Sequence, residues 1–317
     1  MTLTKRLSLF AAAAAFTAST AALAAPTFIN ILTGGTSGVY YPIGVGLSQL
    51  YGDGIDGAKT SVQATKASVE NLNLLQAGRG ELAFALGDSV ADAWNGVEEA
   101  GFKAPLQKLR AIAGTYPNYI QIVANAESGI ATLEDLKGKR ISVGAPKSGT
   151  ELNARAIFKA AGLSYEDMGE VQFLPYAESV ELIKNRQLDA TLQSSGLGMA
   201  AIRDLASTMK ISFVAIPAEV VAKIGNAAYQ PGVIPANTYD GQSADVPTVA
   251  ITNILVSQAG VSDEVAYQMT KLMFGNLDKL STAHSAAKDI SLEGAAKNLP
   301  IPLHPGAERY YKEVGAL

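Results

Sequence analysis

Apolar segments of strand length alternate with amphipathic helical segments along most of this 317-residue chain. The segment TFINIL at 27–32 is typical of a strand, and Ile43, Leu47 and Leu50 then follow at helical spacing. The unit returns over residues 171–207 as strand, loop, helix, strand, loop and helix. This alternation predicts an α/β fold with parallel sheets that helices cover on both faces.

Further segments complete this pattern. Residues 68–78 predict a helix with Ser68 as its N-cap and Gly78 as its C-cap. Residues 109–126 predict two strands that are separated at Tyr116-Pro117. The C-terminal third predicts a long apolar strand, a long amphipathic helix and a short final helix, over 246–260, 262–280 and 304–315.

The first 24 residues have the three parts of a secretory signal peptide. Lys5 and Arg6 form a positive end, Leu7–Ala18 is apolar, and Ala22-Leu23-Ala24 is a small-x-small cleavage site. The chain has no cysteine, which excludes disulfides, zinc–thiolate sites and a lipid anchor on cysteine. We therefore expect residues 1–24 to be a signal peptide and the protein to be periplasmic, without a lipid anchor.

The charge of the chain argues against nucleic acid as a partner. The formal net charge is −4, and no long basic run occurs. Apolar residues make up 48% and charged residues 17%, which is typical of a globular protein with a substantial core.

Polar turns rich in glycine, serine and threonine recur between predicted strands and helices. They are GGTSGVYYP at 34–42, KASVEN at 66–71, APKSGTE at 145–151, PYAESVE at 175–181 and QSSGLG at 193–198. Ligands of parallel α/β sheets bind beyond the carboxyl ends of the strands, where such turns meet. Helix starts present free N–H groups, so the five turns predict an anionic ligand held largely by neutral donors.

Patterns for other kinds of site are weak or absent. Neither the Walker phosphate-binding pattern nor the dinucleotide pattern occurs in the first turn. Ser207–Lys210 matches S-x-x-K, but its order relative to the lysine-serine-glycine element at 147–149 is opposite to that of penicillin-binding enzymes. His284 and His304 lack metal-binding spacing, and a remote catalytic triad stays open. We predict no catalytic residue, cofactor or metal.

The chain resembles the TAXI family of substrate-binding proteins of TRAP transporters. The resemblance covers nearly the whole chain after residue 24. It rests on blocks that occur in the family's order, at 34–42, 68–85, 88–96, 128–154, 233–251 and 302–313. The most telling block is SGIATLEDLKGKRISVGAPKSGTELNA at 128–154.

The resemblance implies a type II periplasmic binding fold, in which two α/β lobes enclose a ligand cleft. Lobe 1 would comprise 25–122 and 256–317, and lobe 2 would comprise 123–255. The segments YIQIVANA and TVAITNILV would be the two crossing strands. The family implies a monomer that delivers a small organic acid, such as glutamate or 2-oxoglutarate, to fused small and large TRAP membrane subunits driven by an ion gradient. An ABC-type receptor of the same fold and a periplasmic serine hydrolase stay open as alternatives.

The same resemblance implies a set of ligand-binding residues. One wall of the cleft would be formed by Gly35 to Tyr41 and by the helix start at Ser68. The opposite wall would be formed by Lys147 to Thr150 and by the turn after Thr191. Tyr116 would contact the ligand near the hinge. The full set is Gly35, Thr36, Ser37, Gly38, Tyr40, Tyr41, Ser68, Asn71, Tyr116, Lys147, Ser148, Gly149, Thr150, Gln193, Ser194 and Ser195.

Three positions depart from the family pattern. Lys66-Ala67 stands where Gly-Gly is frequent, and Lys147 stands where glycine is common. Both departures add cations near the expected cleft, and Lys147 would form a charge-assisted bond with a carboxylate unless it is a solvated turn lysine. Leu86-Gly87 replaces Gln-Ser before Asp88 and removes polar groups.

Overall fold

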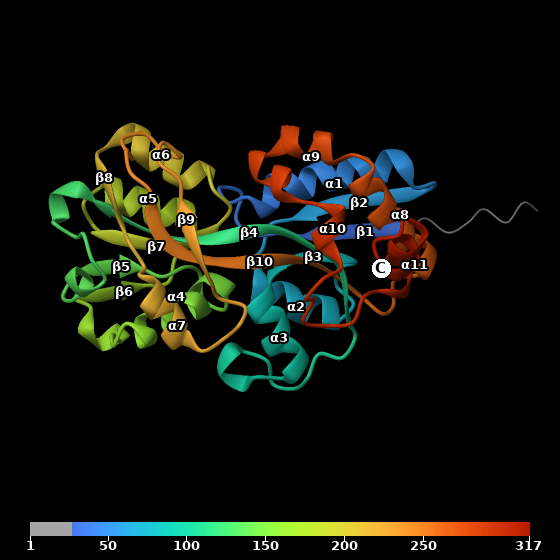
Figure 1. The fold of residues 1–317 in the computed structure, drawn as a ribbon, viewed down its shortest axis with the longest axis horizontal. Helices are drawn as coiled ribbons and strands as arrows, with labels where there is room; N and C mark the ends of the chain where they lie inside the picture. Colours follow the sequence, from blue (N-terminus) through green and yellow to red (C-terminus); the bar gives the residue numbers. More distant parts are fainter. Residues whose placement is uncertain (1–26) are drawn as a thin grey trace, which may run out of the picture.

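The computed structural model describes residues 27–317. The predicted signal peptide at 1–24 lies outside the described residues. The strands of the described part form one hydrogen-bonded sheet in the order β2-β1-β3-β10-β4-β7-β5-β6, with β8 beside β4 and β9 beside β10. Figure 1 shows that this sheet is divided into two halves, each covered by helices.

The first half has a parallel sheet. β1 (Thr27–Leu32) lies between β2 (Ala58–Gln63) and β3 (Leu82–Leu86), and pairs in parallel with both. The helices of this half are α1 (Tyr40–Gly54), α2 (Ser68–Gln76), α3 (Gly87–Asn95), α8 (Asp263–Phe274), α9 (Leu277–Ala283), α10 (Leu292–Ala295) and α11 (Pro305–Glu313). α1 packs with α8 and α9 on one face, and α2 packs with α3 on the other.

The second half repeats this arrangement. β5 (Arg140–Ser142) pairs in parallel with β6 (Glu170–Gln172) and β7 (Ala190–Ser195). The other elements of this half are β8 (Ile211–Val214), β9 (Gln230–Ile234), α4 (Gly149–Ala160), α5 (Tyr176–Lys184), α6 (Ala200–Thr208) and α7 (Ala218–Ile224). α4 packs with α7, and α5 packs with α6. Short 3₁₀ turns are η1 (Glu98–Ala100), η2 (Ala126–Ser128), η3 (Glu134–Leu136), η4 (Tyr165–Asp167) and η5 (Ser285–Asp289).

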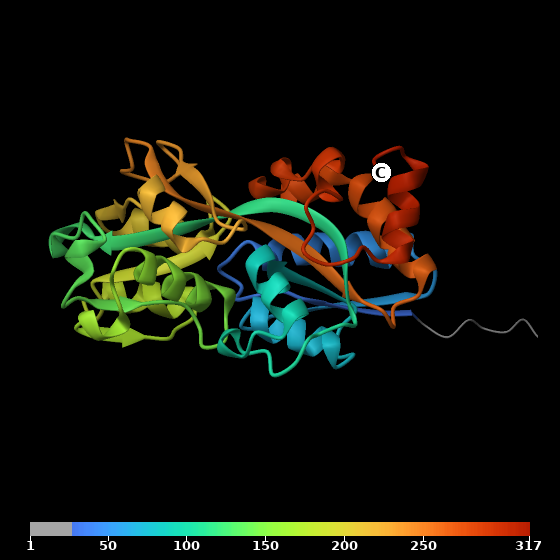
Figure 2. The same ribbon diagram turned by 60° about the horizontal axis from the view of Figure 1, so that its bottom comes forward.

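Two long antiparallel strands connect the halves. β4 (Leu109–Asn125) and β10 (Val246–Gln258) run from one half into the other in both ribbon views (Figures 1 and 2). β4 pairs with β10 up to Tyr119 and with β7 from Tyr119 onward. The prediction of two α/β lobes joined by two crossing strands is therefore confirmed. The expected separate parallel sheets are instead one mixed sheet, because β4 and β10 pair antiparallel with their neighbours. The lobe boundaries expected at 122/123 and 255/256 lie inside these strands.

Three details of the predicted elements are wrong. β4 is continuous through Pro117, because a register shift opposite Thr252 and Ile254 accommodates the residue that has no N–H. The helix expected over 262–280 is two helices, α8 and α9, separated at Gly275-Asn276. Ser68 is the first residue of α2 rather than its N-cap, since Ala67 occupies the N-cap position.

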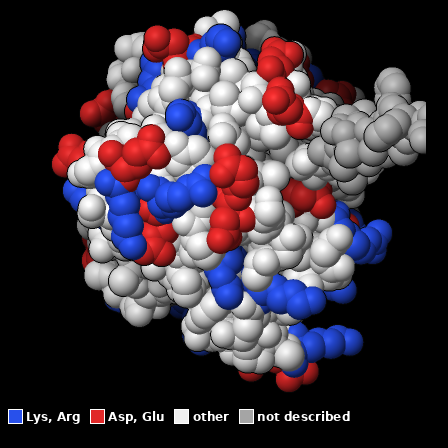
Figure 3. All heavy atoms as spheres, turned by 90° about the vertical axis from the view of Figure 1, so that its right-hand side faces the viewer, with Lys and Arg blue, Asp and Glu red and all other residues white. Residues whose placement is uncertain are grey.

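Apolar side chains from both faces of the sheet form the core. One buried cluster, including Leu72 and Val256, lies under α2 and α3, and another, including Ile157 and Leu192, lies inside the second half. The outer end of the first half is highly charged, with positive and negative side chains interspersed (Figure 3). There the Arg309 guanidinium bonds the Glu264 carboxylate at 2.6 Å, joining α11 to α8. Some of the buried polar groups, among them Asp88, Asn118 and Asn153, lie between the two halves.

Candidate functional site

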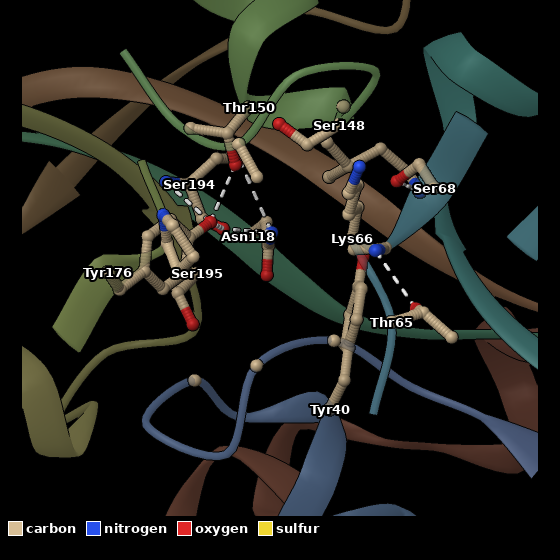
Figure 4. A pocket seen from close by; sticks show the side chains of 18 of the residues that line it. Tyr40, Thr65, Lys66, Ser68, Asn118, Ser148, Thr150, Tyr176, Ser194 and Ser195 are labelled. Atoms are coloured by element: carbon tan, nitrogen blue, oxygen red, sulfur yellow. Dashed lines mark hydrogen bonds between the residues drawn. The ribbon is translucent and has the colours of Figure 1, made fainter. Parts of the chain in front are cut away.

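A cavity of about 140 Å³ lies between the two halves. Residues from all five polar turns singled out in the sequence line it (Figure 4). Its lining is Gly34, Gly35, Gly38, Val39, Tyr40, Thr65, Lys66, Ala67, Ser68, Leu86, Asn118, Ala145, Ser148, Gly149, Thr150, Pro175, Tyr176, Ser194 and Ser195. Drug-sized ligands occupy pockets of roughly 300–1,000 Å³, so this cavity suits a smaller molecule.

Four helices begin at this cavity. The first residues of α1, α2, α4 and α5 are Tyr40, Ser68, Gly149 and Tyr176, and all four line it. The first N–H groups of a helix have no partner within the helix, and the helix dipole makes this end positive. Two such ends come from each half, so their fields favour a negative charge in the space between them.

The floor of the cavity is a chain of hydrogen bonds through both crossing strands. The Tyr40 hydroxyl donates to Asn253 Oδ1 at 2.5 Å, and Asn253 Nδ2 donates to Asn118 Oδ1 at 2.9 Å. Asn118 Nδ2 then donates to the Ser194 carbonyl at 3.0 Å. The chain joins α1 of the first half to β7 of the second, which fixes the amides where β4 and β10 cross.

Tyr176 continues this network in the second half. Its hydroxyl donates to the Ser194 carbonyl at 2.7 Å and lies 2.6 Å from the Thr150 hydroxyl oxygen. Burial raises the pKa of Tyr176, and it also raises the pKa of Tyr40 well above the ordinary tyrosine value. Both phenols therefore stay protonated and neutral at physiological pH.

The oxygens of three serine hydroxyls at the cavity accept bonds from N–H groups of the protein. Ser68 Oγ accepts the Leu86 N–H at 3.1 Å, and Ser148 Oγ accepts the Glu151 N–H at 3.2 Å. Ser194 Oγ accepts from Asn118 Nδ2 at 3.3 Å. Each of these hydroxyls also has one hydrogen that can donate and a second lone pair that can accept.

Lys66 supplies a charge to this otherwise neutral lining. It comes from the turn between β2 and α2, and Figure 4 shows it among the residues around the cavity. Lys147, the lysine that the sequence favoured, is exposed and lies outside the lining, with a left-handed backbone at φ 61°. No carboxylate side chain belongs to the described lining of the cavity.

The cavity brings together nine of the sixteen residues that the resemblance implies. They are Gly35, Gly38, Tyr40, Ser68, Ser148, Gly149, Thr150, Ser194 and Ser195. Thr36 and Tyr41 instead line a neighbouring hollow with Pro42 and His284. The carbonyl of Ser37 accepts the N–H of Ala201 at 3.2 Å.

The other predicted site residues are buried beside the cavity. Asn71 Nδ2 donates to the carbonyls of Thr33 at 2.7 Å and Phe84 at 2.9 Å, and so ties the ends of β1 and β3 together. Gln193 lies inside β7, and Tyr116 belongs to the apolar core, where its hydroxyl has no partner among the described residues.

Sequence reasoning did not select several of the lining residues. Thr65, Asn118 and Tyr176 are polar members of this group. Tyr176 does stand in a predicted polar turn, and Asn118 follows Pro117 where the predicted strands were separated. In the sequence, the signal that could have indicated Tyr176 was its position in a polar turn, and the signal for Asn118 was its position after a proline.

A second contact between the halves lies behind the cavity. Asp88 of α3 is buried, and its Oδ2 accepts from Asn153 Nδ2 at 2.8 Å and from the Tyr229 hydroxyl at 2.6 Å. Burial raises the pKa of Asp88, while the bonds from Tyr229, Ser89 and Asn153 lower it. Asn153 and Tyr229 belong to the second half, so this buried carboxyl links the two halves.

Neither a membrane-spanning helix nor a metal-binding cluster is found within residues 27–317. Both histidines cap helical segments. His304 Nδ1 accepts the Gly306 N–H at 3.2 Å, and His284 Nδ1 accepts the Ala286 N–H at 3.1 Å. Neither ring lines the cavity, so no serine there has a histidine beside it among the described residues.

Comparisons with known proteins agree with this architecture. A model of the NMT1-like family matches residues 31–315. PhnD1 from Prochlorococcus marinus, solved with methylphosphonate, has 10% identity and a TM-score of 0.56, covering 92% of this chain and 100% of that chain. A binding protein component of an ABC phosphonate transporter from Pseudomonas aeruginosa has 13% identity and a TM-score of 0.53, covering 84% and 80%.

A third similar structure is the alkanesulfonate-binding protein SsuA from Xanthomonas axonopodis pv. citri bound to MOPS. It has 15% identity and a TM-score of 0.51, and the match covers 91% of both chains. At these identities the similarity shows the fold alone. The predicted two-lobe α/β fold of periplasmic binding proteins is thus confirmed.

Proposed function

The chain belongs to the NMT1-like family, and from this membership and the cavity we propose that it is a solute-binding protein that delivers a small organic anion to a membrane importer. It carries out no catalysis. The single observation that carries the proposal is the start of four helices at one cavity between two halves. Neutral hydroxyls, free helix N–H groups and Lys66 then form a lining of hydrogen-bond donors, which suits an anion.

The proposed mechanism is closure of the two halves over the ligand. β4 and β10 cross between the halves and would serve as the hinge. Close packing at the cavity supports this, since a Cβ added at Gly149 of the second half would lie 2.7 Å from Ser68 Oγ of the first. A bound anion would contact both halves and favour the closed form, which the importer would recognise.

Two kinds of importer are candidates. The similar solved structures include a binding protein component of an ABC phosphonate transporter, which supports an ABC-type receptor better than the TRAP receptor that the sequence favoured. The ordered sequence blocks support a TAXI receptor that serves fused small and large TRAP subunits. Either role places the protein in the periplasm after removal of the predicted signal peptide. Uptake by proteoliposomes containing the importer would require ATP in the first case and an ion gradient in the second.

We infer the class of ligand from the hydrogen-bond donors that line the cavity, not from the ligands of similar proteins. Glutamate and 2-oxoglutarate are the carboxylates that the TAXI resemblance implies. Phosphonates and sulfonates are the anions named for two proteins of similar fold. All of these present oxygens that accept hydrogen bonds from serine hydroxyls and helix N–H groups.

A thermal-shift screen of carboxylates, phosphonates and sulfonates tests the proposal. An anion present at about 100 times its Kd should stabilise the folded protein by about 2.7 kcal/mol, which raises Tm by several degrees. Thr150→Ala should reduce that shift, whereas Thr36→Ala, outside the lining, is the matched control. The proposal is wrong if no anion of the three classes raises Tm while neutral sugars or cations do.

A further inference from the structure

We propose that the ligand is an organic anion without an ammonium group, and that Lys66 enforces this choice. The inference rests on the proposed function and narrows its ligand class. It separates oxo acids, hydroxy acids and simple phosphonates or sulfonates, which would bind, from the amino acids, which would not. Glutamate is therefore excluded, although it was one of the two acids expected from the resemblance.

The first observation is the balance of charge around the cavity. Lys66 is the charged residue of the lining that the structure describes, and neither aspartate nor glutamate belongs to that lining. Within residues 27–317, no carboxylate lies within 4.0 Å of the Lys66 ammonium. An amino acid brings its own ammonium, which would meet a like charge and find no carboxylate to pair with.

The second observation is the direction of the hydrogen bonds. The oxygens of Ser68, Ser148 and Ser194 already accept bonds from N–H groups of the protein. Each hydroxyl keeps one hydrogen to donate, which serves carboxylate, phosphonate or oxo oxygens, while one of its two lone pairs is already used. An ammonium needs acceptors instead, and leaving a buried charged group without them costs more than leaving a neutral one.

The third observation is that side-chain hydrogen bonds hold the backbone of the Lys66 turn in place. The Lys66 N–H donates to Glu70 Oε2 at 2.6 Å, and the Ala67 N–H donates to Thr65 Oγ1 at 3.0 Å. Thr65 Oγ1 lies 2.6 Å from Asn71 Oδ1, which anchors the turn to the buried Asn71. Asn71 thereby acts as a positioning residue for Lys66. Glu70 is outside the lining, and its carboxylate is used by this backbone bond.

The strength of the Lys66 effect is limited by its exposure. Its side chain reaches solvent, so water and salt partly screen its charge. We therefore expect Lys66 to strengthen ligand binding by an amount near the lower end of the range for charge-assisted hydrogen bonds. This amount is equivalent to a change in Kd of about 10-fold. The described lining also has no carboxylate to pair with the ammonium of an amino acid, which increases the preference for ligands without ammonium. An oxo acid should therefore bind at least about 10-fold tighter than its amino counterpart.

Calorimetric titration with matched pairs tests the inference. The probes are pyruvate and alanine, oxaloacetate and aspartate, 2-oxoglutarate and glutamate, and methylphosphonate and aminomethylphosphonate. An ammonium group replaces the oxo group in the first three pairs and a hydrogen atom in the fourth. In every pair that binds, the member without ammonium should bind tighter. An amino member that binds equally well or better overturns the inference and leaves the proposed function standing. If no member of any pair binds and the anion screen above is also negative, the proposed function itself fails.

Variants of Lys66 test its role separately. Lys66→Met should weaken binding of the preferred anion about 10-fold and reduce the preference over its amino counterpart, while Lys66→Arg should keep both. Lys147→Met removes the same charge outside the lining and should change neither. Because Lys66 is exposed, the Tm of the unliganded variants should equal that of the wild type. Equal affinities for Lys66→Met and the wild type would overturn the role of Lys66.

Discussion

Tyr229→Phe tests whether the buried Asp88 contact holds the two halves together. The substitution removes a hydroxyl that donates to Asp88 Oδ2 at 2.6 Å and accepts from Asn153 Nδ2 at 2.8 Å, and it keeps the ring. Tyr229 is 6% exposed and Asp88 is 3% exposed, so water does not readily replace the lost bond. Neither residue belongs to the described lining of the cavity, so a change in ligand affinity would report on closure rather than on direct contact.

The magnitude follows from the kind of bond that is lost. A hydrogen bond to a charged group contributes about 1.5–3 kcal/mol. Burial raises the pKa of Tyr229, which keeps its hydroxyl protonated and able to donate. Asn153 Nδ2 still donates to Asp88 in the variant, so we expect the lower part of that range. If the bond forms only in the closed protein, the ligand should bind about 10-fold weaker.

The pH dependence gives a second readout. Burial raises the pKa of Asp88 in the folded protein, and the Tyr229 bond lowers it. A carboxyl with a raised folded-state pKa contributes most stability below its unfolded pKa and loses it as the pH rises through the folded value. Tyr229→Phe raises the pKa of Asp88 further, so the variant should be most destabilised at neutral and higher pH and should approach the wild type on acidification.

Calorimetric titration with the anion found in the screen measures the affinity, and thermal melts at several pH values measure the stability. Tyr51→Phe is the matched control, because Tyr51 is fully buried and its hydroxyl has no partner among the described residues. That control should bind like the wild type. Wild-type affinity in a folded Tyr229→Phe variant would refute the role of this contact in closure.

Three further predictions concern the contact surface and its backbone. Gly149→Ala should weaken ligand binding about 10-fold or more, because its Cβ would lie 2.7 Å from Ser68 Oγ and keep the halves apart. Gly294→Ala, whose Cβ would meet its nearest neighbour at 3.5 Å, should bind normally in the same titration. Ala67→Gly should raise the free energy of unfolding by about 1 kcal/mol in thermal melts, because Ala67 has φ 68° and ψ −148°, a conformation that favours glycine. An unchanged or lower Tm would contradict this prediction. Asp92→Asn should raise Tm at pH 7–8, because burial first and the Asp88 charge second raise the pKa of Asp92 to about 6. The stability that wild-type Asp92 supplies below its ordinary pKa of 3.8 is lost as the pH rises through about 6. The gain in Tm from Asp92→Asn should therefore vanish in acid. A gain in Tm that grows in acid would contradict this pH dependence.

The polar turns were readable in the sequence because their chemistry is local. Glycine, serine and threonine at a helix start satisfy or expose N–H groups within a few residues. The alternation of strands and helices places those starts at the carboxyl edge of each sheet. The α/β class and the donor-rich character of the site could therefore be expected from the residues, whereas the two lobes and the two crossing strands were implied by the resemblance to the TAXI family.

Local rules failed where packing decides the direction of a side chain. Lys66 and Lys147 stand in similar turns, and both adjoin unusual backbone, yet Lys66 reaches the cavity and Lys147 does not. Pro117 stays inside β4 beside a register shift that leaves one extra residue on β4 relative to β10, which only the assembled sheet reveals.

The amino-acid sequence alone determined the fold class and the chemical character of the cavity, since both depend on periodicity and on residues a few positions apart. Only the tertiary structure decided which side chains meet. Asp88 and Tyr229 are 141 positions apart, and Tyr40 and Asn253 are 213 positions apart, yet each pair shares a hydrogen bond. Such contacts depend on how the two halves pack across β4 and β10, and no spacing along the chain encodes that packing directly.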